Sequence, residues 1–253
     1  MIQDLHSHTY YSFCGKDKPE EIVEAAIAGG IELFGITDHS HGAAYGRFDV
    51  YKLPDEALPR KYDPRSMERY FDHINLVREK YADRITVLRG IEIATVWDPE
   101  YSKWCLPEDA DVSMFDYCLI EHLDNPESIT KGNLFSFAER CGCKNVGVAH
   151  TDLFAHAKKL GEDPYRYFCR MAEQGIFWEM NVSYDSTHSY REHEYMLRFF
   201  ADAEQQAIIR ESGVRLSVGF DGHRVYDYRP HRVADYCRRV TELGIKLAFE
   251  ENV

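Results

Sequence analysis

Short apolar runs alternate with segments of helical period along the whole chain. The apolar runs predict strands at residues 2–6, 33–37, 85–93, 115–121, 145–149, 176–180 and 214–219, and an eighth short run occupies 245–249. Helical periodicity lies between them, at residues 18–30, 64–81, 134–141, 164–174, 190–211 and 232–243. This alternation is typical of a parallel sheet built from βα units. Seven or eight such units favour a barrel over an open sheet.

The chain has 253 residues, of which 44% are hydrophobic, and this is enough for one complete core. Because barrels of this class commonly reach this length undivided, we expect a single domain over residues 1–253. Two connections, 40–63 and 94–114, are much longer than the usual loop of about two to six residues. Long loops on such a scaffold often shape an active site. We therefore expect both to lie over the carboxyl ends of the strands.

Charge and composition narrow the class of protein. The formal net charge of −13 disfavours binding to nucleic acid or to anionic membranes. No apolar run approaches the roughly 18 residues that span a bilayer, and no signal-peptide pattern opens the chain, so we expect a cytoplasmic protein. The seven cysteines are an odd count without C-x-x-C spacing, which favours reduced thiols over a disulfide framework. The oligomeric state is left open.

Each predicted strand ends in, or is followed by, at least one His, Asp or Glu. These residues are His6, His8, Asp38, His39, Glu92, His122, His150, Asp152, Glu179, Asp221 and His223. In a parallel barrel the carboxyl ends of the strands share one face, where active sites are built. So many nitrogen and oxygen ligands on one face require cations to offset them.

The spacing of the first two histidines has a physical reason. Residues two apart on an extended segment point the same way, so His6 and His8 can reach one ion. Asp221 and His223 repeat this spacing. A single H-x-H also occurs in ordinary loops, and only the joint pattern indicates a metal site. Imidazole and carboxylate ligands suit zinc, manganese or iron rather than calcium or magnesium. His188 follows the sixth strand and is a further candidate for the pocket wall.

These motifs resemble those of the PHP (polymerase and histidinol phosphatase) superfamily of metal-dependent phosphoesterases. The segments DLHSH, GITDHS, GIEI, IEHLD, VGVAHTD and FDGH occur in the expected order between residue 4 and about residue 223. The resemblance implies a distorted (β/α)7 barrel. It also implies two or three divalent transition metal ions, zinc, manganese or iron, at the carboxyl face.

The resemblance further implies a ligand set. The first ion would be bound by His6, His8, Glu92 and Asp221. Glu92 would bridge to a second ion, which would also be bound by His122 and His150. His39 and His223 would contribute to a third ion. Asp4, Asp38 and Asp152 resemble residues that orient the imidazoles of metal ligands.

One position departs from the family pattern. Members with three ions usually carry a third His eight residues after the first, and this chain has Cys14 there. A thiolate binds zinc well and suits manganese poorly. The third site would then be zinc-selective, weak or absent, with His41 and Asp17 as alternative ligands. The other reading of Cys14 is a small buried thiol that binds no metal.

The function implied by the resemblance is hydrolysis of a small phosphate monoester by a metal-bound hydroxide. Asp221 and His223 are predicted to act in catalysis. A cationic side chain should stabilise the charge that the metals leave uncovered, and Arg191, Arg224 and Lys16 are candidates by position. The segment WEMN resembles the histidinol phosphatases and favours histidinol phosphate as substrate. Glu121, next to His122, departs from the small or apolar neighbour usual in that group, so other small phosphoesters stay open.

Two other classes of function remain. Similar barrels with H-x-H motifs hydrolyse amides or lactones, although such amidohydrolases normally have a carboxylated Lys on a middle strand, where this chain has Glu92. A non-catalytic PHP-like module that acts as a partner would be favoured by missing ligands, and only the Cys14 position is altered. The sequence contains no G-x-S-x-G elbow and no P-loop, so serine nucleophiles and nucleotide cradles lack support.

Overall fold

The computed structural model describes residues 1–45, 64–96, 106 and 111–250. Seven strands form one sheet in chain order, and every neighbouring pair is parallel. They are β1 (Gln3–Asp4), β2 (Leu33–Ile36), β3 (Thr86–Ile93), β4 (Tyr117–Ile120), β5 (Val146–Val148), β6 (Phe177–Asn181) and β7 (Leu216–Gly219).

The sheet curves until its first and last strands meet. The backbone N–H of Leu5 donates to the carbonyl oxygen of Val218 at 2.9 Å, and that of Asp221 donates to the carbonyl oxygen of His6 at 2.8 Å. These bonds join the segment after β1 to β7, so that the barrel is nearly closed. The prediction of an α/β fold of the (β/α)7 barrel type is confirmed.

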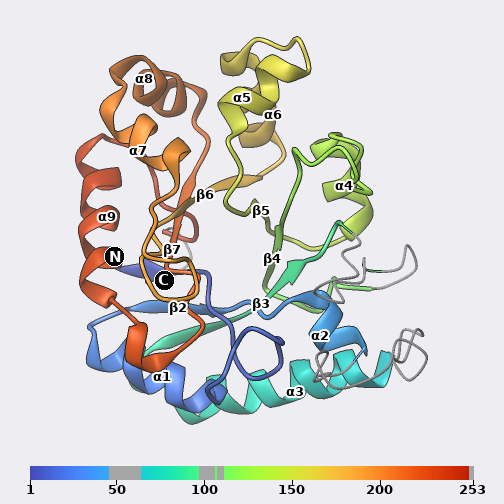
Figure 1. The fold of residues 1–253 in the computed structure, drawn as a ribbon, viewed down its shortest axis with the longest axis vertical. Helices are drawn as coiled ribbons and strands as arrows, with labels where there is room; N and C mark the ends of the chain where they lie inside the picture. Colours follow the sequence, from blue (N-terminus) through green and yellow to red (C-terminus); the bar gives the residue numbers. More distant parts are fainter. Residues whose placement is uncertain (46–63, 97–105, 107–110, 251–253) are drawn as a thin grey trace.

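The helices follow one another around the outside of the strands in chain order (Figure 1). They are α1 (Pro19–Ala28), α2 (Ser40–Tyr45), α3 (Pro64–Lys80), α4 (Leu134–Cys141), α5 (Leu153–Lys159), α6 (Pro164–Glu173), α7 (Glu194–Ala201), α8 (Ala203–Ser212) and α9 (Pro230–Glu242), with a 3-10 turn η2 (Val225–Asp227) before α9.

Side chains alternate between the inside of the barrel and the helix layer. On β6, Trp178 and Met180 pack in the main hydrophobic core between strands and helices, whereas Phe177 belongs to a smaller cluster. That cluster, at the amino-terminal end of the barrel, contains Leu5, Leu33, Tyr117, Leu119, Ala149, Phe177, Ala248 and Phe249. The carboxyl end of the barrel is therefore left to polar groups. Glu179 and Asn181, which are also on β6, contact the polar groups at that end.

The eighth apolar run is not a strand of the barrel. Within 245–249 only Leu247 pairs with the sheet, through a single parallel bridge to Leu216 at the start of β7. Ala248 and Phe249 join the small cluster, and the side-chain amide of Gln3 donates to the carbonyl oxygen of Ala248 at 2.6 Å. The run therefore packs across the amino-terminal end of the barrel.

The helices of the structure differ from the predicted ones in three places. The segment 190–211 is two helices, because the backbone of Asp202 is extended and its carboxylate accepts the N–H groups of Glu204 and Gln205 as an N-cap. Helix α5 was not predicted, and the connection 40–63 begins as α2. The rest of that connection, and most of 94–114, lies outside the described residues.

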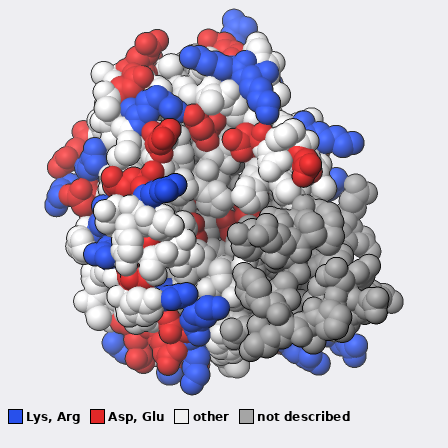
Figure 2. Space-filling model, viewed as in Figure 1, with Lys and Arg blue, Asp and Glu red and all other residues white. Residues whose placement is uncertain are grey.

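No helix in the described part of the chain combines the length and apolar character needed to cross a membrane. On the face shown in Figure 2, Lys and Arg are interspersed with Asp and Glu over the described surface. This view therefore gives no broad basic stripe of the kind that follows a phosphate backbone.

Candidate metal centre

Two histidines that follow β1 point to the same place. Nε2 of His6 lies 3.1 Å from Nε2 of His8, as the two-residue spacing predicts. Nε2 of His8 also lies 3.0 Å from Oδ1 of Asp221, which follows β7, and Nε2 of His6 lies 3.4 Å from Oε1 of Glu92 on β3. All four side chains are buried. The structure thus brings together the four residues expected to bind the first ion.

Glu92 also faces a second group of donors. Its Oε1 lies 3.0 Å from Nε2 of His150, which follows β5, and its Oε2 lies 2.7 Å from Nδ1 of His39, which follows β2. Glu121, at the end of β4, offers a carboxylate oxygen to the same group as Glu92 and His150. Nε2 of His122 lies 3.3 Å from Glu121, but this side chain is 37% exposed. Glu121, which differs from the small or apolar neighbour expected in histidinol phosphatases, is therefore a candidate ligand.

Cys14 faces the cluster. Cys14, His8 and His223 each place a potential ligand atom within 4.8 Å of the other two. Of the alternative ligands, His41 is buried in α2, and Asp17 accepts the backbone N–H of a residue in η2 at 2.6 Å. Among the described residues, neither belongs to a group of three donors. Cys14 is therefore better placed than His41 or Asp17.

His188, in the loop after β6, also belongs to this cluster of potential metal ligands. The carboxylate of Asp185 lies 2.7 Å from Nδ1 of His188 and accepts its backbone N–H at 2.9 Å, and Nε2 of His188 lies 3.0 Å from Oδ2 of Asp221. Burial would lower the pKa of His188, but the two carboxylates raise it to about 10. Asp185, His188 and His223 form a further group of three donors. The only sign of Asp185 in the sequence is its three-residue spacing from His188.

Glu179 on β6 holds two of the predicted ligands, His6 and His150, in place. Its Oε1 lies 2.7 Å from Nδ1 of His6, and its Oε2 accepts the backbone N–H of His150 at 2.8 Å. Gly219 on β7 leaves the space for this contact, since a Cβ there would meet Oε1 of Glu179 at 2.3 Å. When Nδ1–H of His6 donates to Glu179, the lone pair of Nε2 faces the cluster, as a metal ligand requires.

The three aspartates expected to orient imidazoles have different roles. Asp38 accepts the hydroxyl of Ser12 at 2.7 Å, and that hydroxyl oxygen lies 3.2 Å from Nδ1 of His8, so its effect on His8 is indirect. Asp4 accepts two backbone N–H groups and a tyrosine hydroxyl. The prediction for Asp152 was wrong: this residue caps α5 and pairs with an arginine at the surface, because Asp directly before a helix favours the N-cap.

The carboxylates and imidazoles perturb one another strongly. Burial alone would raise the pKa of Glu92, but His39 and His6 hold it well below its usual range. Burial alone would lower the pKa of His6, but Glu179 and Asp221 raise it well above its usual range. The buried carboxylates therefore stabilise positive charge here. The donor set and this charge balance fit divalent zinc, manganese or iron.

Three of the predicted ligands have left-handed backbone conformations. The φ angles are 53° at His122, 24° at His150 and 56° at Asp221. Such conformations are uncommon for residues other than glycine and cost on the order of 1–3 kcal/mol each. They occur directly after strands β4, β5 and β7, where each turns a side chain toward the cluster or its rim.

Most of these donors, although not His6, His8 or Asp185, line an open cavity of about 400 Å³. Its wall also includes Phe13, Thr187 and His193. No Lys or Arg is among the described residues that line it. Arg191 is exposed before α7, and the guanidinium of Arg224 donates to a neighbouring tyrosine hydroxyl at 2.7 Å. Lys16 donates to a backbone carbonyl oxygen at 3.2 Å.

The sequence matches the profile of the PHP domain family over residues 4–246. The chain belongs to this family. Among solved structures it is similar to a histidinol phosphate phosphatase from Lactococcus lactis subsp. lactis in complex with zinc, L-histidinol and phosphate. The identity is 15%, the TM-score is 0.53, and the match covers 97% of this chain and 95% of the other.

A structure named as a histidinol phosphatase from Listeria monocytogenes also matches, with 15% identity, a TM-score of 0.51 and coverage of 89% of this chain and 96% of the other. No curated protein sequence matches significantly. At these identities the two structures establish the PHP barrel fold, while the chemistry must be argued from the site itself.

Proposed function

We propose that this PHP protein is a metal-dependent hydrolase of small phosphate monoesters, with histidinol phosphate as the first substrate to test. Family membership and the donor set support a metal-dependent hydrolase. The observation that carries the proposal is the convergence of His6, His8, Glu92 and Asp221 on one buried point that opens into the cavity. The Lactococcus structure, which contains zinc, L-histidinol and phosphate, supports the choice of substrate.

The residues of this chain would have distinct roles in such a hydrolase. His6, His8, Glu92 and Asp221 would hold one ion, and Glu92, Glu121 and His150 a second. Bound metal ions would supply Lewis acidity and lower the pKa of water. Glu179 and Asp185 would keep the imidazoles of His6 and His188 in the required tautomers.

The electrostatics of the cavity make metal a condition for binding phosphate. Glu92, Glu121 and Asp221 line the cavity, and no Lys or Arg does so among the described residues. A phosphate dianion would be repelled by these carboxylates unless bound cations outweigh them. The same observation favours a second candidate function, hydrolysis of an uncharged amide or lactone, because such a substrate needs no cationic side chain.

The test is hydrolysis by the purified protein before and after chelation, together with its metal content. Histidinol phosphate and p-nitrophenyl phosphate represent the first function, and p-nitroacetanilide with a simple lactone represents the second. We expect at least one equivalent of transition metal, and phosphatase activity that chelation removes and added metal restores. Chelator-sensitive hydrolysis of the amide or lactone alone would replace the first proposal with the second. Less than one equivalent of metal with no hydrolysis would reject both.

A further inference from the structure

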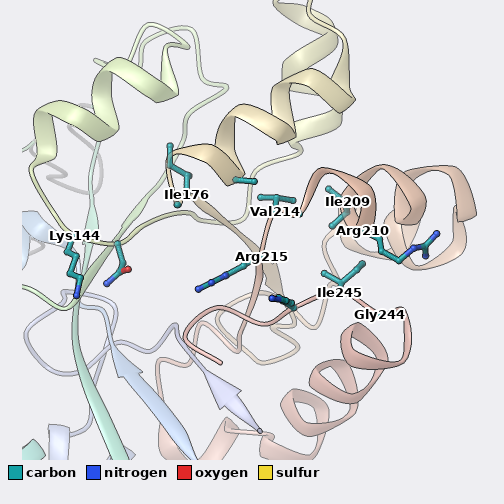
Figure 3. Close-up of a pocket in the computed structure, with 13 residues that line it drawn as sticks. Lys144, Ile176, Ile209, Arg210, Val214, Arg215, Gly244 and Ile245 are labelled. Atoms are coloured by element: carbon teal, nitrogen blue, oxygen red, sulfur yellow. The ribbon is translucent and has the colours of Figure 1, made fainter. Parts of the chain in front are cut away.

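Three residues on the wall of the cavity at the carboxyl end of the barrel have no place in the metal centre. Phe13, Thr187 and His193 line this cavity, and they are neither predicted ligands nor members of a group of three donors. The pocket drawn in Figure 3 lies at the other end of the barrel, near the run 245–249, and no predicted ligand lines it. Within the described part of the chain, these three residues are therefore the ones placed to contact a substrate beyond the atoms that metal ions would bind.

His193 is the member of this trio whose hydrogen-bonding groups are both held in the wall and unused. Its side chain has no hydrogen bond or ion pair to any residue that the structure describes. Phe13 has no hydrogen-bonding group in its side chain, and Thr187 is exposed. An imidazole can donate from one ring nitrogen and accept at the other. A substrate group could therefore bind His193 without breaking an existing contact.

Neighbouring rings hold the side chain of His193 beside the metal centre. Its ring is nearly parallel to that of His150, with an angle of 13° and 6.0 Å between the centroids. The ring of Tyr195 lies 5.7 Å away and that of His188 6.5 Å away, again between centroids. His193 thus lies next to donors that follow β5 and β6, although it is not itself a member of a donor group.

The place of His193 in the chain gives its side chain no role in the helix that it precedes. It is the N-cap residue of α7, and its side chain accepts no N–H group of that helix. At the same position before α4, α5, α6 and α8, an Asn or Asp side chain does accept one. Asn and Asp are among the residues strongly preferred at an N-cap. The side chain of His193 therefore lines the cavity instead of capping the helix.

We propose that His193 binds the alcohol part of a phosphate monoester and selects esters in which that part carries a hydroxyl, amine or azole group. The inference rests on the proposed function and names its substrate class. The phosphate group would be left to the metal ions, since no Lys or Arg is found among the described lining residues. An ester with an apolar alcohol would leave the imidazole without a partner, and a site built to hydrogen-bond one substrate discriminates against such an analogue.

The test compares two phosphate monoesters with the metal-loaded full chain. Histidinol phosphate has an amine and an imidazole in its alcohol part, whereas phenyl phosphate has no hydrogen-bonding group there. His193→Phe keeps a ring beside His150 and removes both nitrogens. We expect kcat/KM to fall about tenfold for histidinol phosphate, the equivalent of about one hydrogen bond, and to change less than about twofold for phenyl phosphate. The loss should appear in KM, because the contact is the same in the ground state and the transition state.

Two further variants separate hydrogen bonding from packing. His193→Gln keeps a donor and an acceptor, so it should recover part of the loss for histidinol phosphate. His231→Phe makes the same change as His193→Phe on an exposed position of α9 and is the matched control. It should change neither value of kcat/KM by more than about twofold.

Proton NMR tests the contact without hydrolysis. The Cε1–H resonance of His193 can be assigned by its loss in His193→Gln. In the zinc-loaded chain this resonance should shift when L-histidinol is added to 10 mM, about tenfold above a weak Kd of roughly 1 mM. The resonance of the exposed His231 should not shift.

Different results would reject the role of His193 and the proposed function. Hydrolysis with an equal loss for both esters in His193→Phe, or with no loss for either, would overturn the role of His193 alone. A preference of the unsubstituted chain for phenyl phosphate, or a His193 resonance that L-histidinol does not move, would do the same. If the unsubstituted metal-loaded chain hydrolyses neither ester, the proposed function fails, and the role of His193 fails with it.

Discussion

The contact between Glu179 and His6 can be tested by Glu179→Gln. The partners of this carboxylate are donors: Nδ1–H of His6 to Oε1 at 2.7 Å, and the backbone N–H of His150 and the side-chain amide of Asn181 to Oε2 at 2.8 Å and 3.4 Å. An amide has only one oxygen, and the N–H groups of His6 and His150 lie at different carboxylate oxygens, so that oxygen can serve only one of the two positions. The backbone N–H cannot become an acceptor, so the amide oxygen should stay with His150. The NH2 group then faces Nδ1 of His6 and drives the proton of that ring to Nε2, the nitrogen that would bind metal.

The size of the effect follows from this change of tautomer. Loss of a hydrogen-bonding partner of a metal-binding His typically lowers metal affinity by about 10- to 100-fold, which corresponds to roughly 1.4–2.8 kcal/mol. Glu179 is buried, and Gln is nearly isosteric, so a change of packing should contribute little. We therefore expect the Kd for zinc to rise by about 10- to 100-fold. Competition with a chromophoric chelator measures this Kd, and circular dichroism checks the fold.

Glu68→Gln is the matched control, because it makes the same substitution on an exposed position of α3. It should leave the zinc Kd unchanged within about twofold, since exposed charges this far from the site are screened. If Glu179→Gln is folded and binds zinc as tightly as the unsubstituted chain, the tautomer of His6 is not set by Glu179. The arrangement of ligands deduced above would then be wrong at its first member.

Three further predictions concern other parts of the molecule. His8→Ala and Asp221→Ala should each abolish metal-dependent hydrolysis while the thermal unfolding midpoint shifts little; unfolding of both variants would show that these residues are structural. Cys14→His should raise metal occupancy or hydrolysis rate if the third site is degenerate, and no change in either would place Cys14 outside the centre. Burial raises the pKa of Asp4 to about 6, so the folded chain holds a proton that the unfolded chain releases above about pH 4. The stability from this proton is present below pH 4 and lost as the pH rises to 6, about 3 kcal/mol in all. Asp4→Asn should flatten this slope in denaturant titrations from pH 4 to 7, and an unchanged slope would refute the assignment.

The first ligands could be predicted from the sequence because their arrangement is local. His6 and His8 are two apart on an extended segment, and their Nε2 atoms meet at 3.1 Å. Glu92 and Asp221 follow directly from the position of strand ends, since the carboxyl ends of parallel strands share one face. The regular alternation of strands and helices therefore predicted the barrel. It also predicted those ligands of the site that lie at the ends of strands.

The supporting contacts depend on how separate strands are placed, and the sequence does not contain that information. Glu179 reaches His6 only because β6 and β7 lie side by side and Gly219 leaves room between them. Asp152 follows the same strand as His150, yet at the start of α5 its carboxylate caps the helix. The local preference of Asp for capping a helix therefore outweighed any contact with the metal centre.

A third ion would depend on His223. His223 belongs to two groups of donors, one with His8 and Cys14 and the other with Asp185 and His188. The first group contains a soft thiol and favours zinc, whereas the second has only imidazole and carboxylate donors and also suits manganese or iron. Both groups use His223, and its Nδ1 lies 2.8 Å from the backbone carbonyl oxygen of Asp221, so the other ring nitrogen could bind an ion in only one of the two groups. The two donor sets would therefore compete for His223, and the identity of the metal would decide which set binds it.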